Sequence, residues 1–248
     1  MEKHISTEKN INIANKDNHV VSRSAANTNR IQFSVMALTV AGILFVLYPT
    51  LRPFSDETSL LGAAAFASTN WIVAHVMAIL AFVLLTAGLF GLYISLQDTF
   101  VEHLALRSLV FTWLGAGLTL PFYGAEVFGL NAIGLEAIKQ QSADLISLAN
   151  DVRFGPGFFM ILSGLVLMAV GSILAAVAIW KSRIMPKWSG IPLALGFLMY
   201  LPQFMGTQPI RVAHGLVVAT GCLWIAAGVW RQSNKKKPQQ RKGPLTPF

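Results

Sequence analysis

Charged residues and cysteine are both scarce in this sequence of 248 residues. Asp, Glu, Lys and Arg make up 12% of it, whereas an average soluble domain contains about 25%. Cys222 is the only cysteine, so the chain can form no intramolecular disulfide and no cysteine metal cluster. Because Cys222 lies within an apolar run, we interpret it as a buried structural thiol.

Several motifs that carry chemistry are also missing. The sequence has no Walker-type glycine loop, no GxSxG elbow, no HExxH pair and no arginine-rich voltage-sensor helix. It therefore offers neither a nucleotide-driven motor nor a known hydrolase motif. The basic residues, which give a net charge of +8, do not alternate with aromatic residues. They favour anionic lipid rather than nucleic acid as a partner.

Long apolar runs are what the sequence does contain, most clearly in residues 71–93. This run holds no Asp, Glu, Lys or Arg, and it exceeds the ~20 apolar residues that cross a bilayer as a helix. Further runs of the same character predict an all-α, polytopic membrane protein, a bundle of six transmembrane helices. The six predicted spans are approximately 33–49, 71–93, 108–130, 157–180, 189–205 and 212–230.

The sequence divides into a membrane domain, residues 31–230, between two polar tails. Residues 1–30 are rich in Asn, Lys and Ser and predict a disordered cytoplasmic tail, and residues 231–248 predict a basic one. Within the membrane domain, residues 50–70 and 131–156 mix polar residues with apolar residues at near-helical spacing. We expect these to be two amphipathic segments on the outer face of the membrane.

The distribution of basic residues predicts the orientation. Six spans place both termini on one side, and that side carries 15 of the 19 Lys and Arg residues. By the positive-inside rule, we expect a multi-pass protein of the plasma membrane with both termini in the cytoplasm. Anionic lipids are the expected partners of the basic tails, and a protein partner is compatible with this class. Residues 188–192, which follow a basic turn, resemble those of small multi-pass proteins of bacterial plasma membranes; this resemblance implies a location but no activity.

Three titratable residues from three predicted spans fall at one depth. At ~1.5 Å per residue, His75, Glu126 and His214 each lie about one turn below the outer surface. Ionisable residues inside spans usually face protein or a water-filled cavity, so we expect these three to form one outward-facing polar cluster. Other polar residues lie in or near this layer and are candidates to support it: Tyr123, Arg153, Gln203, Gln208 and Arg211.

The predicted cluster is compatible with several kinds of chemistry. Imidazole and carboxylate groups are zinc ligands, so His75, Glu126 and His214 are the candidate metal ligands. The two histidines could instead hold haem iron axially, and a His–Glu pair could relay protons. The same residues could also serve only helix packing, with Glu126 paired to His75 or Arg211.

The lack of a catalytic motif and of any domain beyond the spans favours a non-catalytic protein. We expect a transporter-like, accessory or immunity-type membrane protein with a small outward-facing polar pocket. The alternative is an intramembrane enzyme, either a metal-dependent hydrolase or a haem-binding oxidoreductase, built on the same three residues. The sequence does not decide between an enzyme and a non-catalytic protein, and it specifies no cofactor and no substrate.

Overall fold

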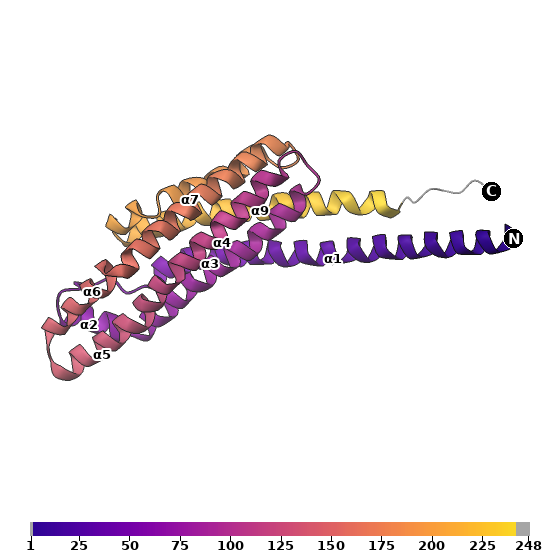
Figure 1. Ribbon diagram of the computed structural model, residues 1–248. Helices are drawn as coiled ribbons and strands as arrows, with labels where there is room; N and C mark the ends of the chain where they lie inside the picture. Colours follow the sequence, from indigo (N-terminus) through magenta and orange to yellow (C-terminus); the bar gives the residue numbers. More distant parts are fainter. Residues whose placement is uncertain (1, 242–248) are drawn as a thin grey trace.

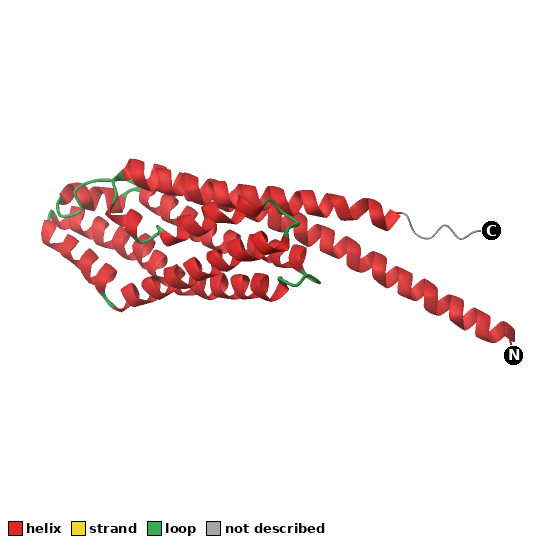
Figure 2. Cartoon of the chain, turned by 90° about the horizontal axis from the view of Figure 1, so that it is seen from above, coloured by secondary structure: helices red, strands yellow, loops and turns green. Residues whose placement is uncertain are grey.

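The chain is helical along nearly its whole length in the computed structural model, which describes the backbone of residues 2–241 and the side chains of residues 27–235. Its α-helices are α1 (Glu2–Leu51), α2 (Leu60–Ala67), α3 (Thr69–Leu96), α4 (Glu102–Gly124), α5 (Leu130–Gln140), α6 (Leu148–Phe154), α7 (Pro156–Ser182), α8 (Ile191–Leu198) and α9 (Gln208–Arg241). Shorter elements are the π-helical turn η1 (Ala125–Gly129) and the 3-10 helices η2 (Ala143–Ser147), η3 (Lys187–Gly190) and η4 (Pro202–Met205). Residues 2–241 contain no β-strand (Figure 2), so the predicted all-α class is confirmed.

Five helical stretches among the described residues are long and apolar enough to cross a membrane, as in a helical membrane protein. They are Asn27–Leu51, Thr69–Leu96, Glu102–Gln140, Pro156–Ser182 and Gln208–Lys235. Each contains most or all of one predicted span. The third stretch joins α4, η1 and α5 into 39 residues, which is about 58 Å of helix and far more than a hydrocarbon core of about 30 Å needs.

The predicted span at residues 189–205 does not form a long helix. It is divided into η3, α8 and η4, so the described residues contain five long helices rather than the predicted six. Two prolines explain the division, because proline lacks an N–H donor and fits the first turn of a helix. Pro192 lies in the first turn of α8 and Pro202 in the first turn of η4, so each opens a new short element.

The divided segment nevertheless runs antiparallel beside α9. Just before its beginning, Met185 lies against Gly228, where an added Cβ would be 3.2 Å from the Met185 Sδ atom. At its end, Arg211 donates a 2.5 Å hydrogen bond from Nη2 to the carbonyl oxygen of Phe204. The segment therefore extends along α9 over nearly the same length as a spanning helix.

Close approach of α4 and α7 is made possible by glycine. A Cβ added at Gly115 would lie 2.6 Å from the carbonyl oxygen of Gly164, so only glycine fits there. The two helices are also joined by a hydrogen bond of 2.7 Å from the Ser108 hydroxyl to the carbonyl oxygen of Gly171. Small residues at helix contacts let backbones approach in this way within membranes.

Three short helices form a cap at one end of the bundle. Helices α2, α5 and α6 gather at the end opposite to that from which α1 and α9 extend (Figure 1). We call these the cap end and the terminal end. The two segments expected on the outer face of the membrane pack against each other, and Asn131 donates a 2.9 Å hydrogen bond to the carbonyl oxygen of Phe66. The cap has its own apolar core, made of Ala63, Phe66, Trp71, Leu130, Ala137, Ile146 and Ala149.

Both tails enter the long helices. Helix α1 begins at Glu2, although a disordered tail is expected for residues 1–30. No glycine or proline precedes Gly42, so the sequence contains no residue that would end this helix early. Helix α9 continues to Arg241, and residues 242–248 of the predicted basic tail lie outside the described residues.

Candidate functional site

A chain of charged side chains connects the cap to the long helices. Glu126 of the π-helical turn accepts hydrogen bonds from the Nε and Nη2 atoms of Arg153 in α6, at 2.6 and 3.2 Å. Arg153 also donates from Nη1 to Glu57, at 2.5 Å, and Arg52 donates from Nη2 to the other oxygen of Glu57, at 2.7 Å. We call Arg52, Glu57, Arg153, Glu126 and the adjacent His75 the cap network.

Glu126 owes its position to the π-helical turn between α4 and α5. Such turns are rare, and they often occur at functional sites because the extra residue redirects side chains and carbonyl groups. The carbonyl oxygen of Glu126 accepts a 2.8 Å hydrogen bond from the indole nitrogen of Trp71. Only 7% of Glu126 is exposed, so its carboxylate needs the two hydrogen bonds from Arg153 to be stable there.

His75 lies behind Glu126, one turn along α3 from Trp71. Its Nδ1 atom is 2.8 Å from the Trp71 carbonyl oxygen, and its Nε2 atom is 3.8 Å from Glu126 Oε2. A carbonyl oxygen is only an acceptor, so Nδ1 carries the proton and, in a neutral imidazole, Nε2 presents a lone pair to the carboxylate. The ring is 1% exposed, and its centroid lies 4.2 Å from that of the tilted Trp71 ring and 5.3 Å, edge to face, from that of Tyr48.

Ion pairing determines the direction in which the pKa values of Glu57 and Arg153 shift. Burial by itself would raise the pKa of Glu57, but the adjacent Arg153 and Arg52 outweigh burial and lower the pKa. Burial likewise would lower the pKa of Arg153, and its bonds to Glu126 and Glu57 raise that pKa instead. Both groups are therefore charged at neutral pH, and each stabilises the charge of the other.

His214 is not brought to the pair of His75 and Glu126. Its Nε2 atom is 2.7 Å from the carbonyl oxygen of Gly196, and its ring contacts that of Tyr200 at 5.1 Å. Among the residues whose side chains are described, no group of three or more His, Cys, Asp or Glu could hold a metal ion. The structure thus brings together two of the three predicted cluster residues and places the third with a different set of partners.

A line of buried tyrosines lies between His75 and His214. The hydroxyl groups of Tyr123 and Tyr200 are 3.0 Å apart, and each ring is within 2% of full burial. Tyr48 contacts both His75, at 5.3 Å, and Tyr123, at 5.9 Å between ring centroids. Tyr123, which the sequence predicts as a supporting residue of the cluster, therefore lies between the two histidines.

The other predicted supporting residues have separate partners. Gln208 donates 3.3 Å hydrogen bonds to the carbonyl oxygens of Pro49 and Thr50, which fixes the start of α9 to the end of α1. Arg211 bonds to the carbonyl oxygen of Phe204 and lies over its ring. Gln203 is buried in η4, and Arg153 is the one supporting residue that enters the cap network.

Sequence reasoning missed two charged members of the network. Arg52 appears in the sequence only as one of four basic residues on the predicted outer side, and Glu57 resembles a helix-start residue. The sequence does contain a signal for this network. Arg52, Glu57 and Arg153 all lie beside apolar segments, where charged residues favour pairing. Trp71 appears in the sequence as an interfacial aromatic residue, but its indole group is fully buried between Arg52 and His75.

Comparison with known proteins adds no further assignment. No family model matches the sequence, and no curated protein and no solved structure matches it either. The function must therefore be argued from the geometry of the site itself.

Proposed function

We propose that this chain is a multi-pass protein of the plasma membrane, with six passes and with both termini in the cytoplasm. The divided segment η3–α8–η4 would make the fifth pass, and the cap would lie on the outer side. We further propose a non-catalytic, transporter-like function in which the pair of Glu126 and His75 binds and releases one proton. Basic residues at the terminal end would then face anionic lipids of the inner leaflet.

The observation that carries this proposal is the close approach of two hydrogen-bond acceptors, His75 Nε2 and Glu126 Oε2. These atoms are 3.8 Å apart, and with Nδ1 bonded to the Trp71 carbonyl oxygen each presents a lone pair to the other. One added proton converts that repulsion into an ion pair or a hydrogen bond. Buried pairs of this kind in membrane proteins commonly mark proton pathways.

Arg153 would link the proton to the cap. When Glu126 is ionised, the guanidinium holds Glu126 of the bundle and Glu57 of the cap loop at once. Protonation at the pair removes or shares the charge that Arg153 balances, which weakens the connection between α6 and η1. Release of the cap would then open the polar site outward, a ligand-driven shift between two states.

Thiol accessibility tests both the opening and the orientation. In a Cys222→Ser background, Val127→Cys places a thiol beside Glu126 at a fully buried position, and Leu135→Cys places one at a position that is 55% exposed. A membrane-impermeant reagent is added outside sealed cells at pH 7.5 and at pH 5.5. The ratio of the two labelling rates removes the effect of pH on the reagent itself.

We expect the labelling rate of Val127→Cys, divided by that of Leu135→Cys, to rise several-fold at the lower pH. Adding Glu126→Gln should remove this dependence on pH. A ratio that does not change with pH while the pair is intact would refute the proton-driven opening. Labelling of Leu135→Cys only after the cytoplasmic side is made accessible would refute the orientation.

Analysis of the purified protein tests the enzyme alternative. Stoichiometric zinc, or a Soret band from haem, would replace this proposal with the hydrolase or the oxidoreductase. Because His214 is bonded to Gly196 and not to the pair of His75 and Glu126, either result would also require the cap end to rearrange.

A further inference from the structure

A groove opens between α1 and α9 in the half of the bundle near the terminal end. The two helices pack tightly near the cap end, where the backbone of Phe45 leaves no room for a Cβ at Gly215. They then diverge toward the terminal end, as the view in Figure 2 shows. Small side chains on α9, Ala226 and Ala227, leave a groove of about 520 Å³ opposite Val35 of α1.

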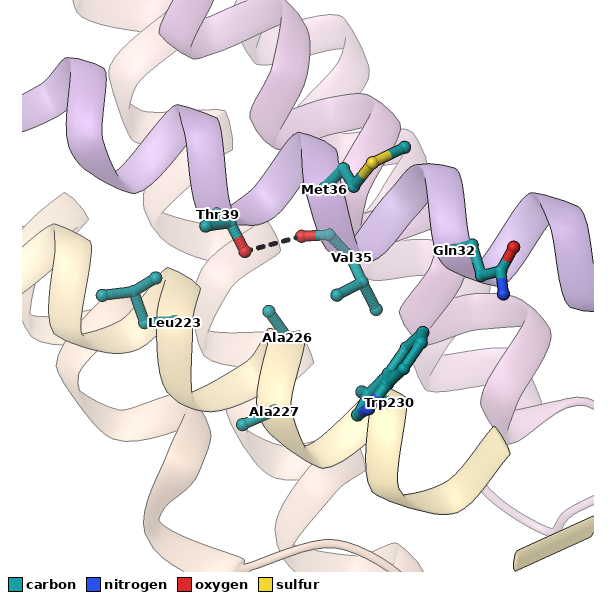
Figure 3. Close-up of a pocket in the computed structure, with 8 residues that line it drawn as sticks. All are labelled: Gln32, Val35, Met36, Thr39, Leu223, Ala226, Ala227 and Trp230. Atoms are coloured by element: carbon teal, nitrogen blue, oxygen red, sulfur yellow. Dashed lines mark hydrogen bonds between the residues drawn. The ribbon is translucent and has the colours of Figure 1, made fainter. Parts of the chain in front are cut away.

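The walls of this groove are apolar along most of its length. Figure 3 shows Met36 of α1 on one side and Leu223 of α9 on the other. Thr39 adds no free donor, because its hydroxyl bonds to the Val35 carbonyl oxygen at 2.9 Å. A hydrocarbon chain is therefore the type of group that these walls fit.

The end of the groove nearest the terminal end is more polar, and two basic residues lie just beyond it. Gln32 and Trp230 lie there, one from each helix (Figure 3). Arg231 and Lys235 follow Ala227 at intervals of four residues, so they continue the same ridge of α9 beyond the groove. Within the part of the chain whose side chains are described, Arg231 and Lys235 are exposed, form no ion pair, and face no acidic partner.

We propose that this groove binds one anionic diacyl phospholipid. An acyl chain would lie between α1 and α9, and the phosphate would lie among Gln32, Trp230 and the two basic residues. Basic pockets between membrane helices on the cytoplasmic side bind anionic headgroups in this way, and tryptophan favours headgroup depth. The inference rests on the membrane insertion in the proposed function but does not involve the proton site.

Charge argues for a lipid in the groove and against a second copy of the chain. In a symmetric dimer the same surface meets itself, so two copies of Arg231 and Lys235 would be brought toward one another. A phosphate instead supplies a negative charge to Arg231 and Lys235, which form no ion pair with any side chain that the structure describes.

Lipid binding is measured on the full-length protein in detergent by native mass spectrometry. Equal amounts of phosphatidylglycerol and phosphatidylcholine are added, and the retained lipid is counted. We expect the protein to retain one phosphatidylglycerol in preference, and Arg231→Gln with Lys235→Gln to reduce that preference ~10-fold. The control pair Lys181→Gln with Lys187→Gln removes the same charge from the same end and should leave the preference unchanged.

A second pair of variants tests the acyl chain. Ala227→Phe fills the groove and should abolish retention, whereas Ala213→Phe changes an exposed position of α9 far from the groove and should not. The melting temperature of each variant establishes that it is folded. Three outcomes would overturn the lipid site. They are an equal loss of lipid preference in both pairs of charge variants, no preference for phosphatidylglycerol in the wild type, and a dimer that Ala227→Phe dissociates. The Val127→Cys to Leu135→Cys labelling ratio should not respond to these variants, so failure of this site is distinguishable from failure of the proton site.

Discussion

In the cap network the charged side chains are at least partly buried and each has a partner, whereas the basic side chains described at the terminal end are exposed and form no ion pair. Arg153 contacts two carboxylates at once, while Lys181, Arg183 and Lys187 form no ion pair among the described residues. The structure of the cap end therefore depends on the charges of the cap network, because a buried ion without its partner is strongly destabilising. Exposed basic residues at the terminal end cost little, which is compatible with the orientation and the lipid site proposed above.

The largest expected effect comes from removing the shared cation of the cap network. Arg153→Met leaves both Glu57 and Glu126 without their main partner, and we expect a loss of about 3–5 kcal/mol in stability. Lys187→Met removes a charge at the terminal end and should change stability by no more than about 0.5 kcal/mol. Thermal unfolding in detergent compares the two. Similar losses would show that the two ends do not differ in the way described.

A double-mutant cycle sharpens the cap end further. His75→Ala and Glu126→Gln should be non-additive by about 0.5–3 kcal/mol, because the two side chains are in contact. His214→Ala and Glu126→Gln should add to within about 0.5 kcal/mol, because His214 has other partners. Chemical or thermal unfolding of the single and double variants supplies both coupling energies. Coupling of His214 as strong as that of His75 would favour the three-residue cluster expected from the sequence.

Acid should weaken the cap end selectively. The pKa of Glu57 is lowered from 4.5 in the folded protein because Arg153 and Arg52 outweigh the effect of burial. Its contribution to stability is therefore fully present above pH 4.5 and is lost as the pH falls below that value. The melting temperature of the wild type should fall across this window, and that of Glu57→Gln should depend less on pH there. A curve for Glu57→Gln that is parallel to the wild-type curve would contradict this assignment.

The smallest effect is expected at the terminal end. Deletion of residues 236–248 should leave insertion and the melting temperature nearly unchanged. Gln232 of α9 donates a 2.9 Å hydrogen bond to the carbonyl oxygen of Ser95 in α3, and this deletion retains it. Expression and thermal unfolding of the truncated chain check the expectation. Loss of stable protein would show that the terminal end, like the cap end, has a structural role.

Much of the fold could be predicted from runs of apolar residues, and much of the site could not. The run at residues 71–93 predicts α3 because its length and lack of charge leave a spanning helix as the stable form. Depth along the helices also placed His75 and Glu126 in one layer, and they are in contact. Depth does not specify which way a side chain faces, so the same argument placed His214 with them, although it bonds to Gly196.

The prediction of the helices failed at two places, and each failure has a local cause. Pro192 and Pro202 divide an apolar run that is long enough to span. The π-helical turn at Ala125–Gly129 instead continues a helix into the cap. Apart from Glu126, this turn contains no charged residue and no proline that would signal the end of a helix. The amphipathic segments were detected by their spacing, but the spacing does not say whether the apolar face meets lipid or another helix.

The sequence by itself determined that the chain is helical and suited to a membrane, because backbone groups in a bilayer must be satisfied within each helix. It also determined the imbalance of basic residues from which the orientation is inferred. Only the tertiary structure decided that Arg153 joins Glu57 to Glu126 and that α1 and α9 leave a groove. Those features depend on contacts between residues far apart in the chain, and such contacts follow from how helices rotate and pack against one another.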